Sequence, residues 1–142
     1  MQTTGGPLSV IERLGDAVNR HDLDALTACF APDYASEFPA HPDRAFRGHA
    51  QMRKNWMQIF GGVPDLAATL LRSASEGDTA WGEWDWRGTR ADGAPFAMRG
   101  VTVVGVADDR ITWARMYMEP VEMSGAGSDA AIQRAAGGGP PE

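Results

Sequence analysis

Apolar residues recur every three or four positions in the first third of the chain, a spacing typical of amphipathic helices. Pro7 suits a first helical turn, and four apolar residues then share one helical face: Leu8, Ile11, Leu14 and Val18. Asp22 is a suitable N-cap for a second, short helix. A third helix is predicted over residues 49–60, and the two glycines that follow, Gly61 and Gly62, end it.

Apolar and polar positions alternate in the second half, which predicts strands. A short strand over residues 34–38 precedes the loop 39–42, and four longer strands follow over 66–75, 79–90, 95–107 and 110–119. Turn signals at 76–78, 91–93 and 108–109 join the four long strands as successive hairpins. Helices first and strands afterwards indicate an α+β fold, with the helices packed on one face of a curved antiparallel sheet.

Length and composition fit one globular domain. The chain has 142 residues, of which 43% are hydrophobic and 23% charged, so a wholly disordered or fibrous chain is excluded. We expect the domain to span residues 7–122, with a flexible N-terminus over 1–6 and a flexible Gly/Ala/Pro-rich tail over 123–142. Within that tail, Ser128 and Asp129 could cap a short helical turn that extends through Ile132.

The charge pattern excludes several classes of partner. There are 13 basic and 19 acidic residues, a net charge of −6, and no basic cluster, so we expect neither nucleic acid nor an anionic membrane surface as partner. No apolar run approaches the ~20 residues of a membrane span. The first residues lack the apolar region of a signal peptide, and we expect a cytoplasmic protein. The single cysteine, Cys29, is predicted to be a small core residue.

Five short phrases along the chain carry a family resemblance. They are Asn-Arg-His-Asp-Leu-Asp-Ala-Leu at 19–26, Phe-Ala-Pro-Asp-Tyr at 30–34, Phe-Arg-Gly at 46–48, Trp-Asp-Trp-Arg-Gly-Thr at 84–89 and Asp-Arg-Ile-Thr at 109–112. Their order and spacing resemble the nuclear transport factor 2-like superfamily and, within it, the SnoaL-like proteins. The resemblance implies a cone-shaped barrel whose curved sheet surrounds a pocket closed by three N-terminal helices. The superfamily hosts cyclases, isomerases, hydrolases and binding modules, so the fold does not settle the function.

The strand over 79–90 presents two different faces, because side chains alternate along a strand. One face carries Trp81, Glu83, Asp85 and Arg87, and the other carries Trp84 and Trp86. The resemblance to limonene-epoxide hydrolases places Asp85 on a catalytic aspartate that faces the pocket, so we assign the charged face to the pocket. The alternative is a ladder of exposed charges that compensate one another.

Two known mechanisms of the superfamily are not supported by the matching positions. In the epoxide-hydrolase pattern, Glu83 replaces an arginine, Met116 replaces the second aspartate, and Ser36 and Phe38 replace the residues that hold water. In the ketosteroid-isomerase pattern, the general base falls at Phe38 and the oxyanion-stabilising acid near Thr102. An epoxide-hydrolase-like activity is retained only as an alternative.

The remaining polar trio suggests acid–base chemistry. Two carboxylates two residues apart on one strand face lie ~7 Å apart, close enough to raise one pKa when both are desolvated. We therefore predict a cofactor-free cyclase, isomerase or dehydratase that acts on a small lipophilic carbonyl compound. The candidate catalytic residues are Asp85, Glu83, Arg87 and His41. The candidate substrate-binding residues are Ser36, Phe38, Trp56, Ile59, Trp81, Met98, Met116 and Met118.

Cofactors and partners complete the expectations. The histidines lack metal-ligand spacing and there is no phosphate-binding loop, so we expect no metal and no cofactor. We expect a homodimer through the sheet face that bears Trp84, Trp86, Trp113 and Tyr117. A non-catalytic binding module and a protein-interaction domain stay open as alternatives.

Overall fold

The computed structural model describes residues 6–137, and its helices and strands follow the predicted order. The first part contains α1 (Pro7–Asn19), α2 (Leu23–Ala28), β1 (Phe30–Glu37), the 3₁₀ helix η1 (Pro42–Arg44), β2 (Phe46–Arg47) and α3 (His49–Gly62). The second part contains β3 (Ala67–Glu76), β4 (Thr79–Thr89), β5 (Pro95–Ala107), β6 (Arg110–Pro120) and α4 (Ser128–Ala135). Most of the predicted N-terminal lead-in (1–6) and the last five residues of the predicted tail lie outside the described residues.

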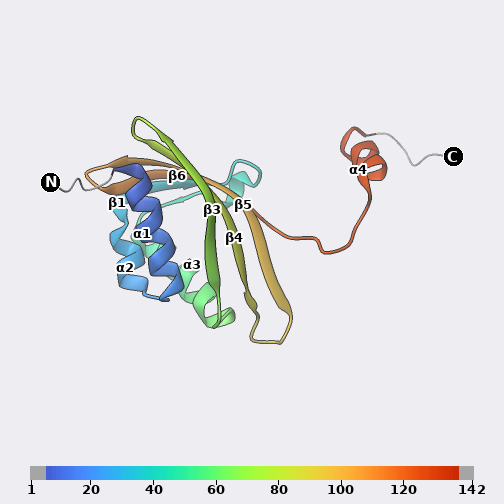
Figure 1. Cartoon of the computed structure of the whole chain (residues 1–142), viewed down its shortest axis with the longest axis horizontal. Helices are drawn as coiled ribbons and strands as arrows, with labels where there is room; N and C mark the ends of the chain where they lie inside the picture. The colour runs from blue at the N-terminus through green and yellow to red at the C-terminus, as the bar shows by residue number, and fades with distance from the viewer. Residues whose placement is uncertain (1–5, 138–142) are drawn as a thin grey trace.

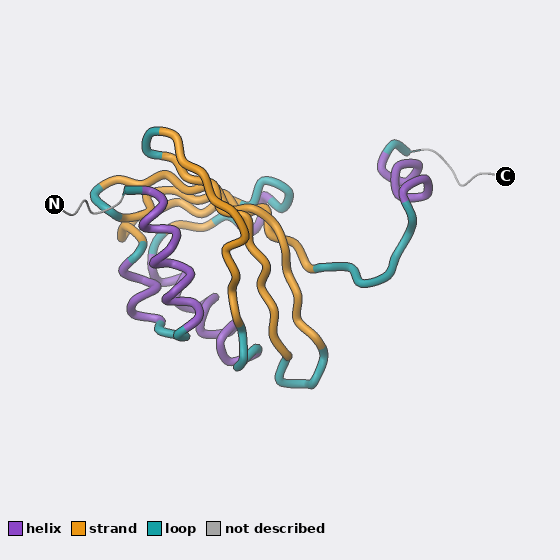
Figure 2. The backbone as a smooth tube through the Cα atoms, in the orientation of Figure 1, coloured by secondary structure: helices purple, strands orange, loops and turns teal. Residues whose placement is uncertain are grey.

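The six strands form one curved, unclosed sheet in the order β2-β1-β6-β5-β4-β3 (Figures 1 and 2). All neighbouring strands run antiparallel except β1 and β6, which run parallel. Helices α1, α2 and α3 lie together on the concave side of the sheet. The predicted α+β fold, with helices covering one face of a curved sheet, is confirmed.

Local sequence signals set the ends of several elements. The Asp22 carboxylate accepts a hydrogen bond from the Ala25 backbone N–H at 3.0 Å and so caps α2 as predicted. Between β5 and β6, Asp108 and Asp109 both adopt positive φ, 53° and 60°. A tight hairpin turn requires this conformation at its two central residues, and Asp tolerates it better than most residues do.

Two side chains fasten loops to the sheet. Asn19, at the end of α1, exchanges two hydrogen bonds with the backbone of Ala68 in β3, at 2.6 and 2.9 Å. The Asp65 carboxylate, in the α3–β3 loop, accepts a hydrogen bond from the Thr89 backbone N–H at 2.6 Å. This hydrogen bond lowers the pKa of Asp65. Both contacts hold the helical layer in place above β3 and β4.

The core lies between the inner sheet face and the helices. Its largest fully buried side chains are Val10, Ile11, Leu26, Met52, Val104 and Ile111. Helix α1 approaches β4 closely because Gly15 has no side chain: a Cβ there would lie 3.0 Å from the Trp84 ring. Trp84 is consequently pressed under α1 and fixed in position.

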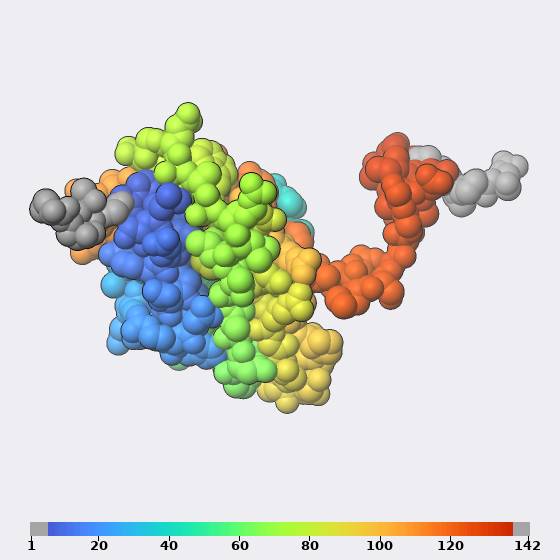
Figure 3. Space-filling view, viewed as in Figure 1, coloured from blue at the N-terminus to red at the C-terminus, as the bar shows by residue number. Residues whose placement is uncertain are grey.

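Helix α4 stands apart from the domain and is joined to β6 by a segment without regular structure (Figure 3). It is longer than the predicted turn, because it continues from Ser128 to Ala135. Across residues 6–137, none of the helices combines the length and the apolar character that crossing a membrane demands.

Candidate functional site

A pocket of about 190 Å³ lies between the inner face of the sheet and helices α1 and α3. Its walls are mainly aromatic, aliphatic and methionine side chains, and the aromatic ones contact one another. The ring centroids of Trp56 and Trp86 are 5.6 Å apart, and those of Phe30 and Tyr34 are 4.5 Å apart. These contacts restrict the rings on both sides of the pocket.

Seven of the eight residues predicted to bind substrate do line this pocket. They are Ser36, Phe38, Trp56, Ile59, Met98, Met116 and Met118. The alternation of each strand explains their common orientation, because Met116 and Met118 stand two residues apart on β6. Their role in binding substrate stays a prediction, but a ligand in the pocket would contact them.

The predicted orientation of β4 is wrong. Trp84 and Trp86 are 2% and 7% exposed and line the pocket, whereas Trp81, Glu83 and Arg87 are exposed on the opposite face. The resemblance to the epoxide hydrolases therefore assigned the wrong face of this strand to the pocket. The physical reason is that two indoles have far more apolar surface to bury than the charged side chains opposite them.

Two charged residues of β4, Asp85 and Arg87, form an ion-pair cluster with Arg99 of β5 on the outer face. Arg87 Nε donates to the Asp85 carboxylate at 3.1 Å, and Arg99 Nη2 donates to it from β5 at 3.4 Å. The Arg87 hydrogen bond lowers the pKa of Asp85. The acid–base hypothesis required a raised carboxyl pKa inside the pocket, and Asp85 meets neither condition. The alternative of a self-compensating surface ladder describes this face correctly.

His41 does not line the pocket either. Its Nε2 lies 2.9 Å from Glu119 Oε2, which joins the loop after β1 to the end of β6. The side chains of both residues are partly exposed. The contact fastens the loop that carries η1, so a structural role accounts for His41.

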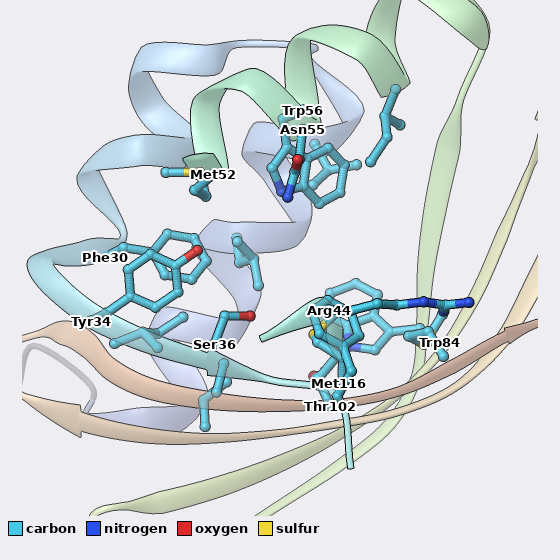
Figure 4. Close-up of a pocket in the computed structure, with 18 of the residues that line it drawn as sticks. Phe30, Tyr34, Ser36, Arg44, Met52, Asn55, Trp56, Trp84, Thr102 and Met116 are labelled. Atoms are coloured by element: carbon cyan, nitrogen blue, oxygen red, sulfur yellow. The ribbon is translucent and has the colours of Figure 1, made fainter. Parts of the chain in front are cut away.

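Three polar side chains line the pocket as hydrogen-bond donors. The sequence alone did not assign this role to any of them. Tyr34 and Ser36 lie two residues apart on β1, and Asn55 lies on α3 (Figure 4). Within residues 6–137, the hydroxyls of Tyr34 and Ser36 have no hydrogen-bond partner. Asn55 Oδ1 accepts from Gln51 Nε2 at 2.8 Å, which leaves the Asn55 NH₂ group as a donor.

The two inward indoles are held differently. Trp84 Nε1 donates to Thr102 Oγ1 at 3.0 Å, and both side chains are buried. Trp86 Nε1 is also buried but finds no acceptor within the described part of the chain. An unpaired buried N–H is costly, so Trp86 is a further donor for which a bound molecule could supply the acceptor.

The pocket is therefore rich in donors and poor in acceptors. Burial raises the pKa of the Tyr34 phenol, so this group keeps its proton and donates at neutral pH. No Asp, Glu or His is found among the described side chains that line the pocket, and one cation, Arg44, lies at its edge. Such a site favours a lipophilic molecule that carries hydrogen-bond acceptors.

Nothing in the described residues forms a metal centre. They contain no group of three or more His, Cys, Asp or Glu side chains arranged to hold a metal ion. Cys29 is buried as predicted, and burial raises the pKa of its thiol. A buried thiol that keeps its proton is a poor nucleophile, so Cys29 is a core residue.

Comparisons with known proteins agree with this geometry. IdmH from Streptomyces antibioticus, described as a candidate polyketide cyclase, is 25% identical; the match covers 81% of this chain and 93% of IdmH, with a TM-score of 0.72. AclR from Streptomyces galilaeus, a candidate hydroxylase, is 17% identical with a TM-score of 0.70, over 79% of this chain and 87% of AclR. A protein with a ketosteroid isomerase-like fold from Catenulispora acidiphila is 19% identical with a TM-score of 0.68, over 80% of this chain and 86% of that protein.

The likenesses below 25% identity show the fold alone. Among curated proteins, none matches this chain. The family model that matches is the SnoaL-like domain, over residues 11–114. This match spans most of the helical layer and the sheet up to the middle of β6, and it includes every pocket residue except Met116 and Met118. The chain belongs to the SnoaL-like domain family, within the nuclear transport factor 2-like fold.

Proposed function

We propose that the pocket binds a small lipophilic carbonyl compound and that the protein promotes ring closure or isomerisation of it by hydrogen bonding to the carbonyl oxygen. The observation that carries this proposal is the lining: an apolar cavity whose polar groups are donors from Tyr34, Ser36 and Asn55. The similarity to IdmH, a candidate polyketide cyclase, supports the same class of substrate.

The size of the pocket supports a compact ligand. An apolar cavity of roughly 150 Å³ accommodates benzene, and this pocket measures about 190 Å³. One ring or two fused rings would fill it, and a longer molecule would extend past the pocket edge near Arg44. Three methionines in the wall, Met98, Met116 and Met118, can adjust to an irregular ligand outline.

The donors have a chemical consequence. A carbonyl that accepts hydrogen bonds from Tyr34 and Ser36 becomes more polarised, and negative charge that develops on its oxygen is stabilised by donors held in an apolar site. The carboxylate mechanism predicted from the sequence is replaced, because Glu83 and Asp85 lie on the other face of β4. Any proton lost from the substrate would pass to water rather than to a pocket carboxylate.

Calorimetry with two matched probes tests the binding part. We expect 2-acetylnaphthalene to bind about 5-fold tighter than 2-ethylnaphthalene, the value of roughly one hydrogen bond. Tyr34→Phe should remove most of that preference, whereas Tyr117→Phe, on the outer face of β6, should leave it intact. Equal binding of the two probes, or an equal effect of both tyrosine variants, would contradict the proposal.

Binding without catalysis is the second candidate, and the lack of a carboxylate or histidine among the described lining residues favours it. Exchange of the acetyl protons of 2-acetylnaphthalene in D₂O, followed by ¹H NMR, separates the two. Carbonyl polarisation predicts faster loss of the methyl signal with wild-type protein than with Tyr34→Phe. An unchanged exchange rate with the ketone bound would leave binding as the function.

We also propose a homodimer, as the sequence predicts, but through a different set of aromatic residues. Trp84 and Trp86 are buried inside and drop out of the interface. Trp113 and Tyr117 remain on the outer face, where Trp81 joins them as an exposed aromatic residue. We propose this aromatic surface as the dimer contact, to be tested by sedimentation of wild type and Trp81→Glu. A cytoplasmic location and the domain limits 7–122 stay predictions.

A further inference from the structure

Arg44 differs from most arginines of this protein. It lies at the end of η1 and is the one charged residue among the described side chains that line the pocket. Several other arginines pair with a side chain or a carbonyl: Arg47 donates to the Asp33 carbonyl at 3.1 Å, and Arg53 donates to Asp24 at 3.1 Å. For Arg44, the structure from residue 6 to residue 137 contains no such acceptor.

Acidic residues of η1 and of the ends of β1 and β6 do not neutralise it. Glu119 is paired with His41 at 2.9 Å, and Glu37 is paired with Arg115 at 3.1 Å. Asp43 precedes Arg44 in η1 but forms no ion pair with it. The pocket wall itself contributes no carboxylate within the described residues. Arg44 is an exposed residue that lines the pocket, so its guanidinium donors are available at the pocket edge.

The position of Arg44 relates its charge to the ligand. Figure 4 shows its side chain across the pocket from Asn55 and Trp56 of helix α3. When the ring system of a ligand fills the apolar interior, a substituent that reaches this edge meets Arg44. A guanidinium offers a planar pair of N–H donors, and the group that matches it in shape and charge is a carboxylate.

We propose that the natural ligand is a lipophilic keto acid, whose carboxylate pairs with Arg44 while its ring system and carbonyl occupy the interior of the pocket. This inference rests on the proposed function, and it narrows the substrate from carbonyl compounds in general to those with an acidic group a few bonds from the ring. Because the protein carries a net charge of −6, long-range attraction of an anion is absent and the selectivity is local to Arg44.

The test compares 4-(2-naphthyl)-4-oxobutanoic acid with its methyl ester by calorimetry at pH 7 and low salt. We expect wild type to bind the acid about 10-fold tighter than the ester, and added salt to reduce this preference. Arg44→Gln should bring the affinity for the acid down to that for the ester. Arg72→Gln removes the same charge from an exposed site on β3, away from the pocket, and should keep the preference.

The outcomes separate this inference from the function on which it rests. Equal affinity of wild type for acid and ester, or a preference that persists in Arg44→Gln, would overturn the inference and leave carbonyl binding intact. A preference lost equally in Arg72→Gln would also overturn it, because net charge would then be the cause. Ala114→Leu narrows the pocket and should weaken both probes; if neither probe binds wild type, the proposed function and this inference fail together.

Discussion

The hydrogen bond between Trp84 and Thr102 gives a stability prediction that follows from the pocket geometry. Trp84 Nε1 donates to Thr102 Oγ1 at 3.0 Å, and each residue is 2% exposed. Thr102→Val keeps the shape of the side chain and replaces the accepting hydroxyl by a methyl group. The indole N–H then loses its acceptor, while Trp84 remains buried between α1 and the sheet.

The expected loss can be estimated from these contacts. A buried donor left without its partner costs about 1–3 kcal/mol, and the new methyl group recovers part of that. We expect a net loss of ~1.5 kcal/mol in the free energy of unfolding, which for a chain of this length lowers Tm by roughly 3–6 °C. Thr69→Val, on the exposed face of β3, makes the same chemical change and should alter stability by less than about 0.5 kcal/mol.

Urea denaturation followed by far-UV circular dichroism measures the effect without relying on tryptophan fluorescence. Trp84→Phe should lower the free energy of unfolding by about 1 kcal/mol less in the Thr102→Val background than in wild type. The reason is that the substitution removes the N–H group that Thr102→Val leaves unpaired. A Thr102→Val protein as stable as wild type, together with equal costs of Trp84→Phe in both backgrounds, would refute the role assigned to this hydrogen bond.

Three further measurements follow from the fold. Gly15→Val should destabilise the protein by ~2 kcal/mol, because the new side chain meets the Trp84 ring. Gly61→Ala, in open space on α3, should stabilise the protein by about 0.5–1 kcal/mol. Thermal melts that show Gly15→Val to be the more stable of the two variants would contradict the packing. The pKa of Asp65 is lowered by a backbone hydrogen bond, so its contribution to stability is present above pH 4 and lost as the pH falls below the ordinary value of 3.8. Urea titrations from pH 5 to pH 3 should show a smaller decline in Asp65→Asn than in wild type. Asp85→Asn should leave the affinity for 2-acetylnaphthalene unchanged, and a loss like that of Tyr34→Phe would place Asp85 in the pocket after all.

The long elements were predictable because each carries its own repeated signal. The three-to-four spacing in α1 and the turn residues before β4, β5 and β6 are local features, and the structure follows them within a few residues. β1 begins at Phe30, four residues before the predicted start at residue 34. Pro32 lies where the pairing of β1 with β6 is irregular, between Phe30 and Ala35, and a proline is tolerated where no ladder hydrogen bond is needed.

Pairing between distant segments was not predictable in the same way. The parallel contact of β1 with β6 joins residues about eighty positions apart, and the two-residue strand β2 has too few positions to show any period. The donor set of the pocket depends on this pairing, because it places Tyr34 and Ser36 beside β6. The resemblance to the epoxide hydrolases could nominate Ser36, but the sequence could not show that Asn55 and Arg44 would line the same pocket.

The sequence of β4 contains a pattern that identifies its inner face correctly, although the prediction did not use it. The inner face reads Gly82, Trp84, Trp86 and Gly88, so glycines flank the two indoles. A Cβ on Gly82 would lie 3.0 Å from Trp84 Nε1, and one on Gly88 would collide with Val63 and Asp65. Glycine and tryptophan in one row indicate a crowded surface, where some neighbours must be small because others are large. The opposite row carries charges of both signs two residues apart, which can pair with one another and stay in water. Side-chain size, rather than the expected chemistry of a pocket, therefore decides which face of β4 is inside, and the hydrogen-bond donors Tyr34, Ser36 and Asn55 reach the pocket from β1 and α3 instead.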